Sequence, residues 1–232
     1  MAPEVVGATA LLAVADSAAA IMPQQRGGTG LALLATSLRE CLERGDGPTT
    51  RDGLLTAAGV AKGSVAAARG VISAGIASTA ELFLQDAVSD AAPDVLASAF
   101  LLLAHCVAAE APLAASLLAS GLFDHIRVAL QMHCGDAYSP QEPLLYAISL
   151  LLRNIAPHMS AGSADALEEL RGTMRRVLKA AAGSTGYIDA PRTAAAILDL
   201  ISVTCAEDAT AREAVRGAEG EEFIVQVRRW QR

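Results

Sequence analysis

Breaks between apolar segments recur along this chain every 45 to 50 residues or so, and this period constrains the fold more than any other feature. Stretches rich in Gly, Pro or charged residues lie at 45–53, 89–94, 134–143 and 183–191. A second marker has the same period, because glycines separated by 45, 46, 51 and 45 residues stand at Gly30, Gly75, Gly121, Gly172 and Gly217. Since glycine permits a tight turn, we expect each of them to separate a short helix from an apolar one. Two markers with one period predict a single repeat domain over residues 1–232.

The apolar residues between the breaks follow a helical spacing. In 121–133 they fall on one face, at Leu122, Phe123, Ile126, Ala129 and Leu130. The segments 95–109 and 144–156 are apolar at nearly every position, which predicts helices buried on most sides. Hydrophobic residues make up 53% of the chain but aromatic residues only 3%, and alanine is abundant. This composition favours closely spaced helices over a β-sandwich.

The segment 111–156 resembles one armadillo repeat. APLAASLLASG resembles its short first helix, LFDHIRVALQMH its second helix and LLYAISLLLRNIA its third. The third helix of that family ends in leucine, any residue, asparagine, leucine and alanine, and here the ending is Leu152-Arg153-Asn154-Ile155-Ala156. The segment 160–206 has the same order, as SAGSADALEELRG, TMRRVLKAAA and PRTAAAILDLISVTCA. The resemblance implies an all-α fold, a right-handed α-solenoid of about five armadillo-like repeats.

The two units before residue 93 fit either armadillo or HEAT repeats, because only the period supports them. The same phasing predicts that the chain opens on a third-type helix at about 3–20 and closes on a capping helix at about 220–231. In the closing helix, we expect apolar side chains including Trp230 to face the core.

Several functional classes are disfavoured by the sequence. The net charge of −7 argues against a general nucleic-acid surface. There is no HExxH, GxSxG or dinucleotide-binding fingerprint, so we expect no catalytic residue, no cofactor and no metal site. His105 with Cys106 is an adjacent pair that would need an oriented third group to act as a nucleophile.

Cell location is predicted from the cysteines and the hydropathy. The four cysteines, Cys41, Cys106, Cys134 and Cys205, form no CxxC pair, which indicates buried, reduced thiols in the cytoplasm. The longest apolar run, 95–109, is shorter than the roughly 20 residues of a membrane span, and it contains His105. The first residues also lack the pattern of a targeting signal. We therefore expect no membrane insertion.

The armadillo resemblance implies that third helices line a groove that binds protein partners. The candidate groove residues are His105, Tyr146, Arg153, Asn154 and Thr204. Asn154 stands at the position where peptide-binding members use asparagine, although a lone asparagine more often satisfies a neighbouring backbone group. The tryptophan positions hold Leu101, Leu150 and Leu200, so the peptide ladder of nuclear import receptors is absent.

A second candidate surface is the basic cluster Arg171, Arg175, Arg176 and Lys179. Its charges can pair along the helix with Glu168 and Glu169 as a solvated face, or they can bind an acidic partner.

The sequence thus predicts a non-catalytic protein–protein interaction scaffold, a subunit of a larger assembly such as a cytoskeletal or ciliary one. The alternative is an armadillo-type nucleotide exchange factor of Hsp70, or a similar chaperone regulator.

Overall fold

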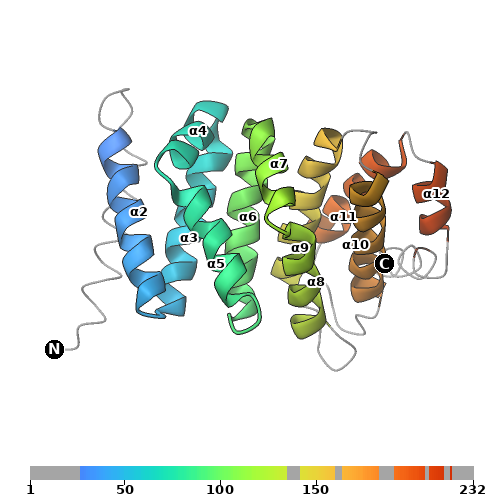
Figure 1. The fold of residues 1–232 in the computed structure, drawn as a ribbon, viewed down its shortest axis with the longest axis horizontal. Helices are drawn as coiled ribbons and strands as arrows, with labels where there is room; N and C mark the ends of the chain where they lie inside the picture. Colours follow the sequence, from blue (N-terminus) through green and yellow to red (C-terminus); the bar gives the residue numbers. More distant parts are fainter. Residues whose placement is uncertain are drawn as a thin grey trace. The chain divides into compact units, whose positions relative to one another are not determined.

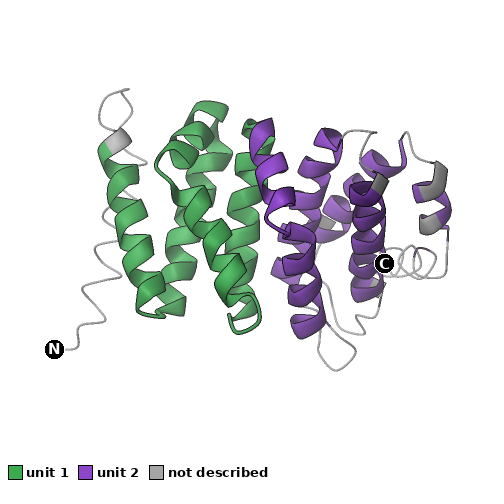
Figure 2. Ribbon diagram, viewed as in Figure 1, with its two compact units in different colours: residues 1–110 green, residues 111–232 purple. Residues whose placement is uncertain are grey.

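The structure is a computed structural model, and it describes residues 27–134, 142–159, 164–182, 191–206, 209–216 and 220. These residues are almost all helical, and none of them is in a β-strand (Figure 1). The all-α prediction is therefore confirmed for the described part of the chain. The chain divides into two compact units, residues 1–110 and 111–232 (Figure 2).

The first unit contains five described helices: α2 (Gly27–Glu43), α3 (Gly47–Gly63), α4 (Val65–Ser73), α5 (Ile76–Ala87) and α6 (Pro93–Ala109). The second contains α7 (Ala111–Ala119), α8 (Leu122–His133), α9 (Glu142–Ile155), the 3₁₀ turn η1 (Ala156–His158), α10 (Ala164–Ala182), α11 (Pro191–Cys205) and α12 (Ala209–Val215).

The core of the first unit is the pair α3 and α6, which lie side by side. Most of α6 is buried, including Phe100, as expected from its unbroken apolar run. The buried side of α3 is mostly small, with Leu54 beside Ala57, Ala58 and Ala61. Small side chains let the two helix axes approach closely, so the alanine-rich composition has a direct packing role.

The core of the second unit is the pair α9 and α11. Eight residues of α9 are buried, from Leu144 to Ile155. The amphipathic helix α10 packs against α8, α9, α11 and α12. It buries Leu170, Thr173, Met174, Val177, Leu178 and Ala181, which recur at helical spacing.

Polar side chains begin two helices of the first unit. The Asp46 carboxylate accepts a hydrogen bond from the Thr49 amide at 3.2 Å, and hydrogen bonding to Thr49 lowers the pKa of Asp46. Ser64 caps α4 in the same way through the Ala67 amide, at 3.1 Å. Because Asp46 caps α3, the predicted break at 45–53 is wrong beyond residue 46, and Gly47–Gly53 is already helical.

The glycine marker is correct at two positions and wrong at two others. Gly75 and Gly121 have φ angles of +78° and +83° and directly precede α5 and α8. At Gly121 the chain bends by 70° between α7 and α8. Gly30 and Gly172, in contrast, lie inside α2 and α10. Glycine costs a helix interior only about 1 kcal/mol relative to alanine, which is too little to end α10 when its apolar stripe is buried.

The other predicted boundaries agree with the structure where it describes them. The segment 111–156 forms three helices in the expected order. The break at 89–94 separates α5 from α6, although its last two residues, Pro93 and Asp94, already belong to α6. Of the breaks at 134–143 and 183–191, Glu142 and Pro143 already belong to α9 and Pro191 to α11, while residues 135–141 and 183–190 lie outside the described ranges. Gly217 and the predicted terminal helices at 3–20 and 220–231, with Trp230, also lie outside them, apart from residue 220 itself.

We predict opposite effects on stability for two glycine-to-alanine substitutions in the first unit. A Cβ atom at either position meets no atom within 4 Å, so only the backbone matters. Gly75→Ala places alanine at positive φ and should destabilise the chain by about 1–2 kcal/mol. Gly59→Ala, in the exposed interior of α3, should stabilise it by about 0.5–1 kcal/mol. Urea denaturation measures both, and effects of the same sign would contradict this account of the turn.

Candidate functional site

Paired polar side chains bridge α9 and α11 in the second unit. The Arg192 guanidinium lies over the ring of Tyr146, 4.3 Å from its centroid, and donates a hydrogen bond to the phenol oxygen at 3.2 Å. The Thr193 hydroxyl donates to the Glu142 carboxylate at 3.2 Å. Further along, Arg153 Nε lies 3.7 Å from a carboxylate oxygen of Asp199. We call these six residues the α9–α11 ladder.

The ladder connects positions about one repeat apart in the sequence. Tyr146 and Arg192 are separated by 46 residues, as are Arg153 and Asp199, and Glu142 and Thr193 by 51. The Arg153 and Asp199 side chains are 41% and 59% exposed. The hydrogen bonds of Tyr146 with Arg192 and of Glu142 with Thr193 restrict those side chains, whereas the exposed Arg153–Asp199 ion pair is longer than a hydrogen bond and restricts its members less.

The predicted groove residues are distributed between the two units. Tyr146, Arg153 and Asn154 all lie half-buried on α9 in the second unit, and the first two belong to the ladder. Thr204 is buried on α11, and its hydroxyl donates to the Leu200 carbonyl at 2.8 Å, so it adds no exposed group. His105 is half-buried on α6 of the first unit.

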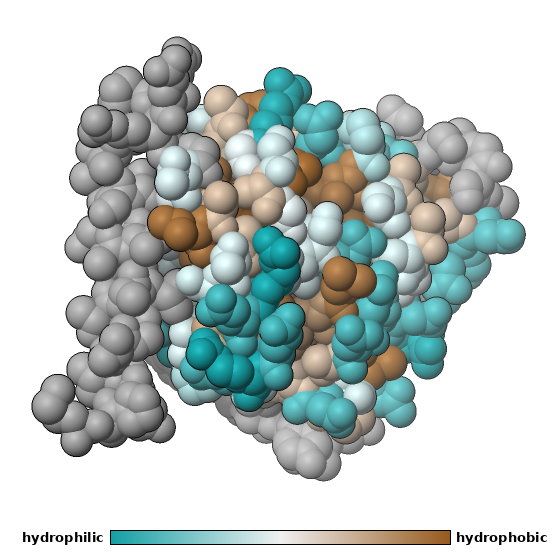
Figure 3. Space-filling model, turned by 60° about the vertical axis from the view of Figure 1, so that its left-hand side comes forward, coloured by the Kyte–Doolittle hydropathy of each residue, from teal (hydrophilic) through white to brown (hydrophobic). Residues whose placement is uncertain are grey.

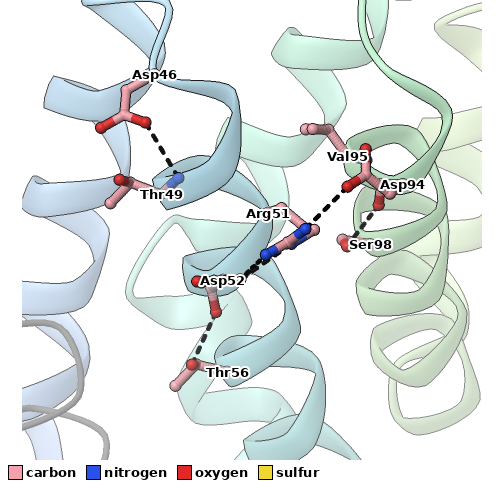
Figure 4. A network of polar contacts seen from close by, with 8 residues as sticks. All are labelled: Asp46, Thr49, Arg51, Asp52, Thr56, Asp94, Val95 and Ser98. Carbon is pink, nitrogen blue, oxygen red and sulfur yellow. Dashed lines mark hydrogen bonds and ion pairs between the residues drawn. The ribbon is translucent and has the colours of Figure 1, made fainter. Parts of the chain in front are cut away.

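The first unit has an ion-pair cluster between α3 and α6 (Figure 4). Arg51 binds the Asp52 carboxylate at 2.9 Å and the Asp94 carboxylate on α6 at 3.0 Å. These hydrogen bonds, first to Asp52 and then to Asp94, raise the pKa of Arg51 above its ordinary value. Asp94 is also held by its own helix, since it accepts from the Val95 amide and its carbonyl accepts from the Ser98 hydroxyl. Arg51 and Asp94 are 43 residues apart, so this cluster also joins two long helices.

Sequence reasoning missed seven members of these two surfaces: Glu142, Arg192, Thr193 and Asp199 of the ladder, and Arg51, Asp52 and Asp94 of the ion-pair cluster. A usable signal was present. Complementary side chains one repeat apart, such as Tyr146 with Arg192, could have been found by aligning the apolar helices.

The predicted basic cluster lies on α10, where Arg175, Arg176 and Lys179 are exposed. Arg171 is mostly buried at 17% exposure and pairs with Glu168 at 2.9 Å. Acidic residues occupy the start of this helix and basic residues its end. That order suits the helix dipole, so the charges have a structural reason to be there.

His105 and Cys106 do not form an activated nucleophile in this structure. Cys106 is fully buried, and desolvation raises the pKa of its thiol to about 12. A nucleophilic cysteine needs a lowered pKa, which is the opposite shift. Among the described residues, no three His, Cys, Asp or Glu side chains are placed to hold a metal ion together.

Within the described ranges, no single helix is long and apolar enough to cross a membrane. Among the described helices, α7 and α8 taken together, with their 70° bend, meet that criterion of length and composition.

Comparison with known proteins does not assign a family. No protein-family model, no curated protein and no solved structure matches this chain.

We predict that the cysteines differ sharply in reactivity. Cys41 and Cys106 are buried, whereas Cys134 and Cys205 are half-buried. With its pKa raised to about 12, the Cys106 thiol is ionised at pH 8 in on the order of one molecule in 10⁴. Iodoacetamide should therefore modify Cys134 and Cys205 first, and all four cysteines only after unfolding in guanidinium, as followed by mass spectrometry. Alkylation of native Cys106 at the rate of Cys205 would contradict the burial of this helix.

Proposed function

We propose that this chain is a non-catalytic scaffold that binds other proteins, built as a right-handed α-solenoid of about five armadillo-like repeats. The order of short helix, left-handed glycine, second helix and long helix supports this architecture. It occurs as α4, Gly75, α5 and α6, and again as α7, Gly121, α8 and α9. The pairing of α3 with α6 and of α9 with α11 supports it as well, because both pairs join long helices about one repeat apart.

The α9–α11 ladder is the observation that carries the binding proposal. It places a cation, an anion and an aromatic ring on the paired helices α9 and α11, at Arg192, Asp199 and Tyr146. Tyrosine and arginine are among the residues that contribute most to protein interfaces. Exposed Leu198 and Val203 on α11 add apolar area, at 43% and 37% exposure. A surface of this mixed kind suits a protein partner better than a small molecule.

The proposed partner belongs to a larger cytoplasmic assembly, for which cytoskeletal and ciliary structures are our leading candidates. The net charge of −7 favours proteins over nucleic acids as partners.

We predict that a photo-reactive amino acid on the ladder surface captures a partner in the source cell. A benzophenone side chain replaces Ala195, which is exposed on α11 between Arg192 and Asp199. The matched control is Gln131, exposed on α8 in the same unit. Irradiation should attach one recurring protein to position 195 and not to position 131, as identified by mass spectrometry.

One double variant completes that experiment. Tyr146→Ala together with Arg153→Glu should remove the adduct at position 195, because they disrupt both ends of the ladder. No adduct at position 195, or the same adducts at both positions, would contradict a binding role for this surface.

A further inference from the structure

The first unit also contains an open cavity of about 650 Å³, whose lining does not include Arg51, Asp52 or Asp94. It is bounded by the end of α2, one side of α5, the first turns of α3 and α6, and the connections from α2 to α3 and from α5 to α6. Its lining is largely apolar and includes Leu42, Leu82, Phe83 and Val95. The volume is in the range of ligand-binding pockets in proteins.

Leu82 is the most informative residue in this cavity. It is 57% exposed. This exposure is unexpected, because its helix, α5, packs against α6 and could bury an apolar side chain there. Large apolar side chains at the surface elsewhere are dispersed over several helices, and hydrophobic residues lie in separate patches on the face seen in Figure 3. At this cavity, in contrast, an exposed leucine adjoins an apolar hollow, which is the arrangement of a docking site.

The charged residues around the cavity are predominantly acidic. Glu43, Asp86 and Asp90 are three exposed carboxylates that come from α2, α5 and the following turn, whereas Arg39 is the one basic residue of the lining. Arg39 Nε donates to the Ala35 carbonyl of its own helix at 3.3 Å. The charged lining residues therefore sum to −2, which attracts cations to the opening.

The interior offers little to orient a small polar ligand. Thr79 is buried, and its hydroxyl donates to the Gly75 carbonyl at 3.0 Å. Pockets for small polar molecules usually contain a few convergent polar groups in an apolar wall. Here the wall is apolar and the charges lie at exposed positions. Such a cavity is complementary to a bound peptide segment that has apolar side chains on one face and basic side chains beside them.

We propose that this cavity is the docking site for an amphipathic, basic helix of a partner protein. One or two large apolar side chains of that helix enter the cavity beside Leu82 and Phe83, while its Lys or Arg residues pair with Glu43, Asp86 and Asp90. The inference rests on the proposed scaffold function and specifies a partner class for the first unit, separate from the ladder in the second unit.

The test uses the full chain and three synthetic fluorescent peptides of about 18 residues, a length of about five helical turns. The first has leucine at helical spacing and lysine elsewhere. The second has the same composition with the leucine spacing scrambled, and the third has glutamate in place of lysine. Fluorescence anisotropy should show micromolar binding of the first peptide and much weaker binding of the other two.

Leu82→Asp distinguishes docking from simple charge attraction. The substitution adds a negative charge, so attraction alone would make the basic peptide bind more tightly. Insertion into the cavity predicts the opposite, a loss of about tenfold or more in affinity. The matched control is Leu33→Asp, at a leucine of the same unit that is 54% exposed and outside the cavity lining. The control should change the affinity less than about twofold, with both variants checked for folding by thermal melting.

Charge reversal tests the carboxylates separately. Asp86→Lys with Asp90→Lys should weaken binding of the basic peptide about tenfold and strengthen binding of the glutamate peptide. Tighter binding by Leu82→Asp, or equal binding of the scrambled peptide, would overturn the proposal. So would self-association of the chain that Leu82→Asp abolishes and Leu33→Asp leaves intact, because the occupant would then be a second copy. Failure of all peptides while position 195 still captures a partner would overturn this inference and leave the scaffold function standing.

Discussion

The packing of long helices in pairs, α3 with α6 and α9 with α11, is the interaction on which the rest of the structure depends. Each fully buried leucine or phenylalanine in these pairs contributes about 1.5–3 kcal/mol. Alanines on α3 keep the helices close enough for this contact. The same closeness brings side chains one repeat apart within hydrogen-bonding distance at the surface, which produces both the Arg51 cluster and the α9–α11 ladder. Core packing thus determines which polar groups lie together at the surface of each unit.

Helix positions in this chain could be predicted well because two local signals are strong. An apolar run as long as 95–109 becomes a buried helix, and Gly121 at the end of a short helix produces a turn with positive φ. The same reasoning was wrong at Gly172, which belongs to the same periodic series of glycines but lies inside α10. Burial of Leu170, Met174 and Val177 outweighs the local preference of one glycine, and that burial depends on tertiary contacts a linear pattern does not contain.

The residues of the candidate site were harder to predict, for a different physical reason. Tyr146 and Arg153 followed from the family resemblance, but their partners Arg192 and Asp199 required knowledge of how α9 and α11 pair. Thr204 was predicted to line the same groove as Asn154, yet its side chain is buried and bonded to its own helix. The cavity beside Leu82 is formed by four helices and two connections, so no single stretch of sequence indicates it.

Native-state hydrogen exchange tests the central claim, that the paired long helices are the stable framework of each unit. Amides in the middle of α6 and α9, where nearly every side chain is buried, should exchange slowest and should open together with those of their partners α3 and α11. Amides of the short helices α4 and α12 should exchange orders of magnitude faster. Exchange of α6 and α9 at the rate of α4 would contradict the account.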